Sequence, residues 1–163
     1  MDRGYYASHT HTLAKEPSET DLRFMLRLVA FVFFADGQLT FAKGLINDEE
    51  PDLWQTHMNG TIERWIDLGQ PSDKRLRRAC GRAKEVVIIN YDERSADVWW
   101  QAEQGKLSRF NNLKVLQVGP VEAMEPLAAL ASRNMQITAT IQDGELWLST
   151  GDSSVTLRME QRG

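Results

Sequence analysis

The sequence contains a single cysteine, Cys80, among its 163 residues. One thiol forms neither an internal disulfide nor a cysteine-rich zinc site, so small domains held by either device are excluded. The longest apolar run, from Leu28 to Ala35, is far shorter than the roughly 20 residues that a membrane-spanning helix requires. Residues 1–9 lack the apolar segment of a secretory signal. We therefore expect a cytoplasmic protein with no membrane partner.

The chain also lacks an excess of positive charge and the common hydrolase and nucleotide motifs. Its formal net charge of −4 argues against a wholly basic nucleic-acid binder but is compatible with a local basic face. It has no G-x-S-x-G, G-x-x-x-x-G-K or G-x-G-x-x-G stretch. Apolar residues make up 42% and charged residues 26%, and no linker or repeat divides the chain. We predict one domain over residues 1–163.

Hydrophobic patterning predicts a mixed α/β or α+β domain. The first helix is apolar almost all round and should be central, with Ser18 and Asp21 as a variant capping box at its start. The continuous apolar run 86–91 is typical of a strand in mid-sheet. Helices are predicted at 18–35, 71–84, 96–104 and 121–131, strands at 5–13, 39–46, 86–91 and 112–118, and a C-terminal β-meander at 135–160, with Asp143-Gly144 as a type I′ turn.

Residues 49–71, "EEPDLWQTHMNGTIERWIDLGQP", predict a β-hairpin that carries one aspartate on each strand. If Asn59-Gly60 is a two-residue type I′ turn, the pairing is fixed, and Asp52 lies directly opposite Asp67. Alternation then places the two aspartates on one face of the hairpin. The acidic face would also hold Glu50, Trp54 and Trp65, and the other face would hold Leu53, His57, Ile62 and Ile66.

Two carboxylates in this position indicate a metal site. Opposed side chains lie about 5 Å apart, where like charges repel by roughly 1 to 3 kcal/mol. A divalent cation reverses the sign, because Mg²⁺ is held by one or two carboxylates together with substrate phosphate oxygens. The alternative interpretation is a solvated acidic loop around residues 47–50.

A strongly basic helix follows the hairpin after a four-residue connection. Its first cations should lie close to Asp67, and arginine together with helix N-terminal amides is suited to binding phosphate. The alternative interpretation is a solvated amphipathic face that neutralises the nearby acids. The basic residues of this segment are Lys74, Arg75, Arg77, Arg78, Arg82 and Lys84.

Several spaced motifs resemble the bacterial YaeQ family over nearly the whole chain: "EPSET", "FAKGL", "DEEPDLW", "WIDLGQP", "RRACGRA", "NLKV" and "TIQDGELWLS". That family is similar in fold to the PD-(D/E)XK nucleases, or restriction endonuclease-like fold, whose core is a helix, three antiparallel strands, a helix and a further strand. The resemblance implies Asp52 (or Glu50) and Asp67 as ligands for Mg²⁺ or Mn²⁺. It implies Glu19 as an additional acid from the first helix.

The sequence departs from the nuclease pattern at one position that bears on chemistry. Gly69 occupies the place of the motif lysine, so a substitute would come from Gln70, which would hold water or phosphate, or from Lys74, Arg77 or Arg78. Arginine is a poor stand-in, because it does not deprotonate. Family members also usually begin with one more strand than this chain.

Three functions stay open at this point. The first is a metal-dependent, nuclease-like protein that acts on or binds the phosphodiester backbone of DNA or RNA. The second is a catalytically inactive regulator or binding module, for nucleic acid or protein, that keeps the nuclease fold. The third is an interaction protein whose charged patches serve self-association.

Overall fold

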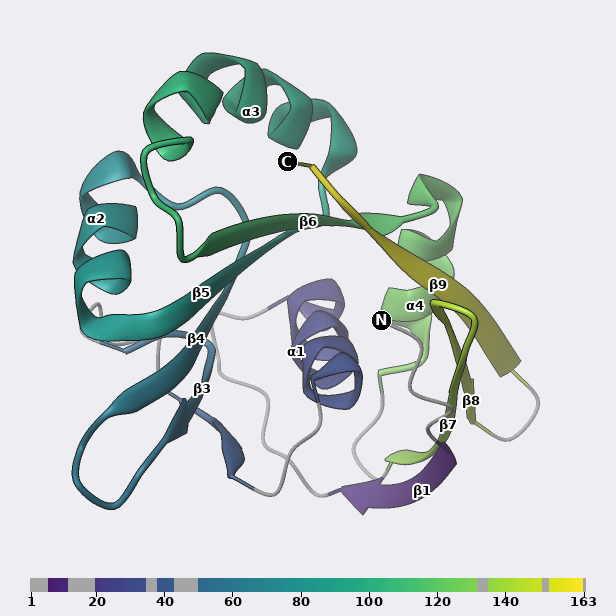
Figure 1. Cartoon of the computed structure of the whole chain (residues 1–163). Coiled ribbons are helices and arrows are strands. Elements are labelled where there is room, and N and C mark those ends of the chain that lie inside the picture. The colour runs from purple at the N-terminus through teal and green to yellow at the C-terminus, as the bar shows by residue number, and fades with distance from the viewer. Residues whose placement is uncertain are drawn as a thin grey trace.

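The computed structural model describes residues 6–11, 20–34, 38–42, 50–131, 135–150 and 153–162. Within these residues nine strands form one sheet, in the order β1-β7-β8-β9-β6-β5-β4-β3-β2. The sheet curls around a central helix, α1 (Asp21–Phe33), as Figure 1 shows. The strands are β1 (Tyr6–His11), β2 (Leu39–Phe41), β3 (Leu53–Thr56), β4 (Ile62–Leu68), β5 (Ala83–Asn90), β6 (Leu113–Gly119), β7 (Met135–Gln142), β8 (Glu145–Thr150) and β9 (Ser153–Gln161).

The centre of the sheet is parallel and its two wings are antiparallel. Strands β4 and β5 pair in parallel, as do β5 and β6, and the connections are made by helices α2 (Asp73–Arg82) and α3 (Glu93–Leu107). The run 86–91 was predicted to lie in mid-sheet, and β5 confirms this, because Val86 to Ile89 are fully buried between two neighbouring strands. The order α1, β2-β3-β4 antiparallel, α2, β5 is also the order predicted for residues 18–91.

Each face of the sheet has its own core. Helix α1 packs on one face, and it is buried along most of its length, which confirms the predicted central helix. The short helix α4 (Met124–Ala129) follows a single 3-10 turn (Val121–Ala123) and packs on the same side through Leu127. Helices α2 and α3 cover the other face through Leu76, Ala79 and Leu107. Among the described residues, no helix has the length and apolar content needed to cross a membrane.

Side-chain caps fix where the two site-forming helices begin. Thr20 is the N-cap of α1 and accepts a hydrogen bond from Arg23 N at 3.1 Å. The prediction of Ser18 as the cap is therefore wrong, and Ser18 itself lies outside the described residues. Ser72 caps α2 by accepting a hydrogen bond from Arg75 N at 3.2 Å, so this helix begins at Asp73, two residues later than predicted. The helix ends at Arg82, two residues earlier than predicted, and Ala83 is both its C-cap and the first residue of β5.

The β3–β4 hairpin reaches the predicted pairing by an unexpected route. Gly60 has φ +87° and donates to His57 O at 2.9 Å, and His57 N donates to Thr61 O, so the loop has three residues rather than two. Thr56 then pairs with Ile62, and a bulge of one residue in β4 restores the register. Trp54 therefore faces Trp65, as predicted.

The bulge changes which face one side chain occupies. Ile62 joins Trp65 in the core beneath α2, whereas Leu53 and Ile66 belong to the core around α1. The prediction that Ile62 shares a face with Leu53 and Ile66 is wrong, because the extra residue shifts the alternation by one position. The Asp143-Gly144 turn is type I′ as predicted, with φ of 54° and 79°.

Candidate functional site

The two predicted aspartates lie next to each other at the end of the β3–β4 hairpin. Asp52 immediately precedes β3, and its main-chain N–H donates to Ile66 O at 3.1 Å and to Asp67 Oδ1 at 3.3 Å. Both residues are buried, with 2% and 3% of their surface exposed. The hairpin register therefore brings the carboxylates together, and both are removed from bulk water.

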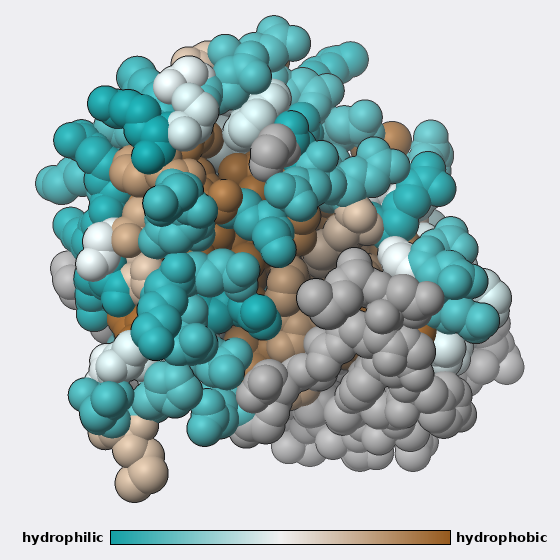
Figure 2. Space-filling model, viewed as in Figure 1, coloured by the Kyte–Doolittle hydropathy of each residue, from teal (hydrophilic) through white to brown (hydrophobic). Residues whose placement is uncertain are grey.

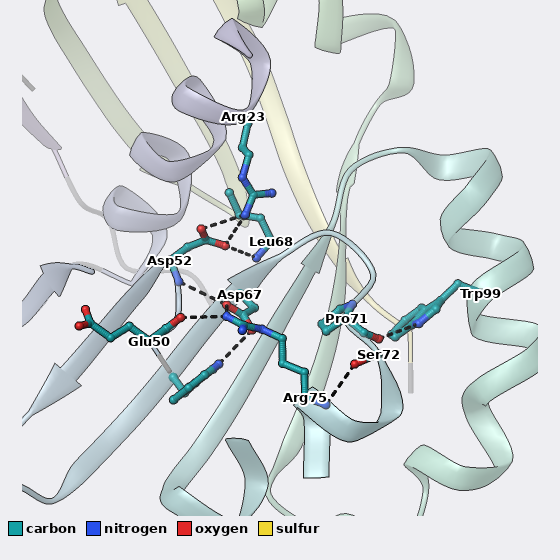
Figure 3. Close-up of polar contacts among 10 residues, drawn as sticks. Arg23, Glu50, Asp52, Asp67, Leu68, Pro71, Ser72, Arg75 and Trp99 are labelled. Carbon is teal, nitrogen blue, oxygen red and sulfur yellow. Dashed lines mark hydrogen bonds and ion pairs between the residues drawn. The ribbon is translucent and has the colours of Figure 1, made fainter. Parts of the chain in front are cut away.

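Helix α1 supplies a cation to the first carboxylate. Arg23 lies in the first turn of α1, and its Nη2 donates to both carboxylate oxygens of Asp52, each at 2.9 Å. The second oxygen also accepts from Leu68 N at 2.9 Å. Figure 3 shows Arg23 reaching down from α1 onto Asp52. Both oxygens of Asp52 are thus engaged by N–H donors.

Helix α2 supplies a cation to the second carboxylate. Arg75 donates from Nε to Asp67 Oδ2 at 2.8 Å and from Nη2 to Oδ1 at 3.2 Å, a bidentate pair of high geometric specificity. The same Nη2 donates to the main-chain oxygen of Glu50 at 2.9 Å. Trp65 Nε1 adds a donor to Asp67 Oδ2 at 3.0 Å, and the Arg75 guanidinium lies 5.8 Å from the Trp65 ring centroid.

The four side chains form a charge-balanced cluster, here called the double ion pair: Arg23, Asp52, Asp67 and Arg75. Its aspartates point to different helices, and these helices pack on opposite faces of the sheet. Burial raises the pKa of Asp52 above its ordinary value, the guanidinium of Arg23 opposes this, and the carboxylate of Asp67 adds to it. Each arginine therefore offsets a desolvation cost that an unpaired carboxylate would carry alone.

The donor set does not fit a resident Mg²⁺ in this arrangement. All four carboxylate oxygens accept hydrogen bonds from nitrogen, and the cations that supply them would repel a divalent ion. Mg²⁺ also requires near-octahedral oxygen ligands and keeps several waters, which this buried cluster does not offer. In the described part of the chain, no three metal-capable side chains gather at one point. Binding of Mg²⁺ or Mn²⁺ stays a prediction.

Gly69 departs from the nuclease pattern for a local reason. Its φ of +98° lies in the left-handed region, where side chains are strained, and a Cβ there would meet Tyr91 Cε1 at 4.0 Å. The glycine turns the chain from β4 towards the α2 cap, and Asn90 Nδ2 donates to its carbonyl at 2.7 Å. Lysine at this position would therefore be strained by the backbone itself.

The other predicted site residues divide between the cluster and its surroundings. Glu50 contributes its carbonyl, and its carboxylate points away from the two aspartates in Figure 3. Gln70 donates to Ser95 Oγ of α3 at 2.7 Å rather than to the cluster. Arg77 pairs with Asp73 at 3.0 Å on the exposed side of α2. Glu19 lies outside the described residues.

A small cavity of about 220 Å³ opens beside the first turn of α2. It is lined by Ser72, Lys74, Arg75 and Arg78, so three predicted phosphate-binding residues surround one space. Hydrophilic side chains cover most of the region of α2 and α3 on the face drawn in Figure 2.

Arg23 is the member of the cluster that sequence reasoning did not assign. Its signal was present, because Arg23 and Arg27 form the only polar stripe of an otherwise apolar helix. Arg27 packs its guanidinium 5.6 Å from the Phe41 ring centroid. A cation on a buried helix requires an acceptor, but the acceptor lies 29 residues later, and the sequence does not identify it.

The fold and the site define a mixed α+β protein in which one curled sheet holds a buried double ion pair. The family model described as YaeQ protein matches residues 1–159, and the chain belongs to the YaeQ family. It is 40% identical over 159 residues to the Escherichia coli (strain K12) protein named "Uncharacterized protein YaeQ", and the match covers 98% of this chain and 87% of that protein.

Two crystal structures extend the similarity to the fold. The YaeQ protein from Xanthomonas axonopodis pv. citri has a TM-score of 0.91 and 47% identity, over 99% of this chain and 91% of that one. The YaeQ protein from Pseudomonas syringae has a TM-score of 0.88 and 28% identity, over 98% and 88%. The predicted family is therefore confirmed.

Proposed function

We propose that this YaeQ-family chain is a catalytically inactive binding module with a PD-(D/E)XK-like core, and that it binds the phosphodiester backbone of nucleic acid. The observation that carries the proposal is the double ion pair. The carboxylates that would hold a metal in a nuclease are each bound to an arginine of the same chain. The element order of α1, β2 to β4, α2 and β5 supports the nuclease-like core.

The binding surface in this proposal is the basic side of α2. Lys74, Arg75 and Arg78 border the cavity beside its first turn, and Arg77 and Arg82 are two more exposed cations of the same helix. Phosphate backbones are bound mainly by Lys and Arg, with helix N-terminal amides as additional donors. Arg75 is already ion-paired with Asp67, so in this proposal it fixes the position of the first turn of α2, and the neighbouring cations make most of the phosphate contacts.

The test is a titration of labelled DNA and RNA, single-stranded and duplex, followed by fluorescence anisotropy over a range of salt concentrations. We expect binding that weakens with salt, and we expect Arg77→Glu with Arg78→Glu to lower the slope of log K against log salt by about two. Lys106→Glu on α3 is the matched control, because Lys106 is a similarly exposed helical cation outside this surface.

The same samples test the loss of catalysis. We expect no cleavage of any of these substrates in Mg²⁺ or Mn²⁺, and binding that is unchanged by a chelator. Metal-dependent cleavage that disappears in Asp67→Asn, with folding of the variant checked by denaturation, would show an active nuclease and overturn the proposal. Absence of salt-sensitive binding to every nucleic acid would overturn it as well.

A further inference from the structure

The β3–β4 hairpin carries an apolar side chain at a position where turns normally hold small or polar residues. Met58 is fully exposed, at 106% of its reference surface, so it has no packing contact with its own chain. The loop around it is well fixed, because Gly60 N donates to His57 O at 2.9 Å and Thr61 N donates to Asn59 Oδ1 at 3.0 Å. A defined loop therefore holds a methionine out in water.

The hairpin continues the basic surface of α2. Ile62 of β4 pairs with Ala83 at the end of α2, and Lys84 Nζ lies 3.5 Å from Glu63 Oε2. Figure 1 shows the hairpin extending past the end of α2 and away from the helices. The elements that flank the base of this projecting arm, α2 and the start of β5, thus carry several cations, namely Lys74, Arg77, Arg78, Arg82 and Lys84.

On the basis of the proposed function, we infer that the β3–β4 hairpin is a groove probe for duplex DNA. The α2 cations would contact the phosphates of one strand, and Met58 would enter the adjacent groove. Because His57 N donates to Thr61 O, Met58 lies about two strand residues beyond the Ile62–Ala83 pair, or roughly 7 Å at the usual rise, which matches a minor groove about 7.5 Å deep. Architectural proteins place apolar side chains, methionine among them, against base steps in the same way.

Chemistry favours a duplex over other occupants of this surface. The cations of α2 suit a phosphate backbone, and the projecting arm with its one flexible apolar side chain suits a groove, which a single strand lacks. Single strands are bound by aromatic platforms, whereas Trp54 and Trp65 beside this surface pack edge to face in the core.

The experiment compares wild type with Met58→Ser, Lys74→Glu and Val98→Ser on a labelled DNA duplex about two helical turns long and on its single strand. Val98 is the matched control, because it is an exposed apolar residue, at 66%, on α3. We expect Met58→Ser to weaken duplex binding roughly tenfold with an unchanged salt slope, since it removes apolar contact and no charge. We expect Lys74→Glu to lower the slope by about one and Val98→Ser to leave both quantities unchanged.

The outcomes separate the hairpin from the helix. If Lys74→Glu weakens binding while Met58→Ser binds the duplex like wild type, the groove probe is refuted and the binding module stands. Equal losses of duplex and single-strand affinity in Met58→Ser would also refute the groove probe. If wild type binds neither DNA, the groove probe is refuted, and the binding module fails as well only if RNA is not bound either. Because Met58 has no packing contacts, its variants should unfold at the same urea concentration as wild type.

Discussion

Replacing Arg23 with methionine tests whether the double ion pair stabilises the fold. Methionine keeps an unbranched apolar stem but is shorter than arginine and lacks the Nη2 group that donates to both oxygens of Asp52. Asp52, at 2% exposure, would keep the N–H of Leu68 as a donor but would lose its charge partner. Removing one partner of a buried pair costs about 3 to 5 kcal/mol, and the partial exposure of Arg23 places the expected loss near 3 kcal/mol.

Urea denaturation at pH 7 measures this loss. With a slope of about 2 kcal/mol per molar urea, the midpoint should fall by about 1.5 M, and the slope itself should stay constant. Lys106→Met is the control, because its contact with Glu103 is 3.8 Å long and exposed, and we expect a change within about 0.5 kcal/mol. The double variant Arg23→Met with Asp52→Asn should recover part of the stability, with a coupling of about 2 kcal/mol.

The pH dependence gives an independent check with a definite sign. Because the folded pKa of Asp52 is raised by burial, its proton is bound more tightly in the folded state, so the free energy of unfolding falls as the pH rises from 3.8 through the raised value. Arg23 lowers the pKa of Asp52, so its loss raises that pKa further and widens the pH range over which the stability changes. Arg23→Met should therefore regain stability as the pH is lowered from 7 towards 5. A cost below 0.5 kcal/mol, strict additivity in the double variant, or a deficit that grows on acidification would refute the reasoning.

Two further predictions concern single residues elsewhere in the chain. Gly69→Ala should destabilise the fold by about 1 to 2 kcal/mol through its φ of +98°, whereas Gly105→Ala in α3, with nothing within 4 Å of a new Cβ, should stabilise it by about 0.5 to 1 kcal/mol. Equal midpoints for the two variants in urea would contradict the backbone argument. Burial raises the pKa of Cys80 from 9.0 to about 11, so at pH 8 its thiolate fraction is about a hundredfold lower than that of an ordinary thiol. Its reaction with a thiol reagent should be slow in the folded protein and fast in urea. In the folded protein the rate should increase with pH up to about 11, and a rate that does not depend on pH would contradict this prediction.

Local patterning was enough to predict much of the fold. The apolar run of β5 placed it inside the sheet, and the Asp143-Gly144 pair predicted the tight turn of the meander. The Trp54–Trp65 pairing was predicted from a two-residue turn, and it holds because the bulge in β4 compensates the third loop residue. The bulge lets Ile62 pack against Leu76 and Ala79 of α2. These residues are distant in the sequence, so a short stretch of the hairpin sequence does not reveal the contact.

The arginine partners show the limit of spacing arguments at a site. The hairpin register brings Asp52 and Asp67 together, and alternation along the strands predicts a shared face. Asp52, however, lies outside β3, so the alternation no longer governs its direction, and it turns to Arg23 of α1. The repulsion between the two acids was correctly anticipated from the sequence, but two arginines of the chain itself provide the neutralising charge.

The junction between α2 and β5 has a consequence for how this protein tolerates length changes. Arg82 ends the helix and Ala83 starts the strand, so no spacer residue absorbs an insertion. One added residue would rotate the helix by about 100° relative to the strand or exchange the two faces of β5, moving a valine–isoleucine layer into the wrong core. Viable insertions in this region should therefore fall at the hairpin loop, where an extra residue changes only the length of the arm.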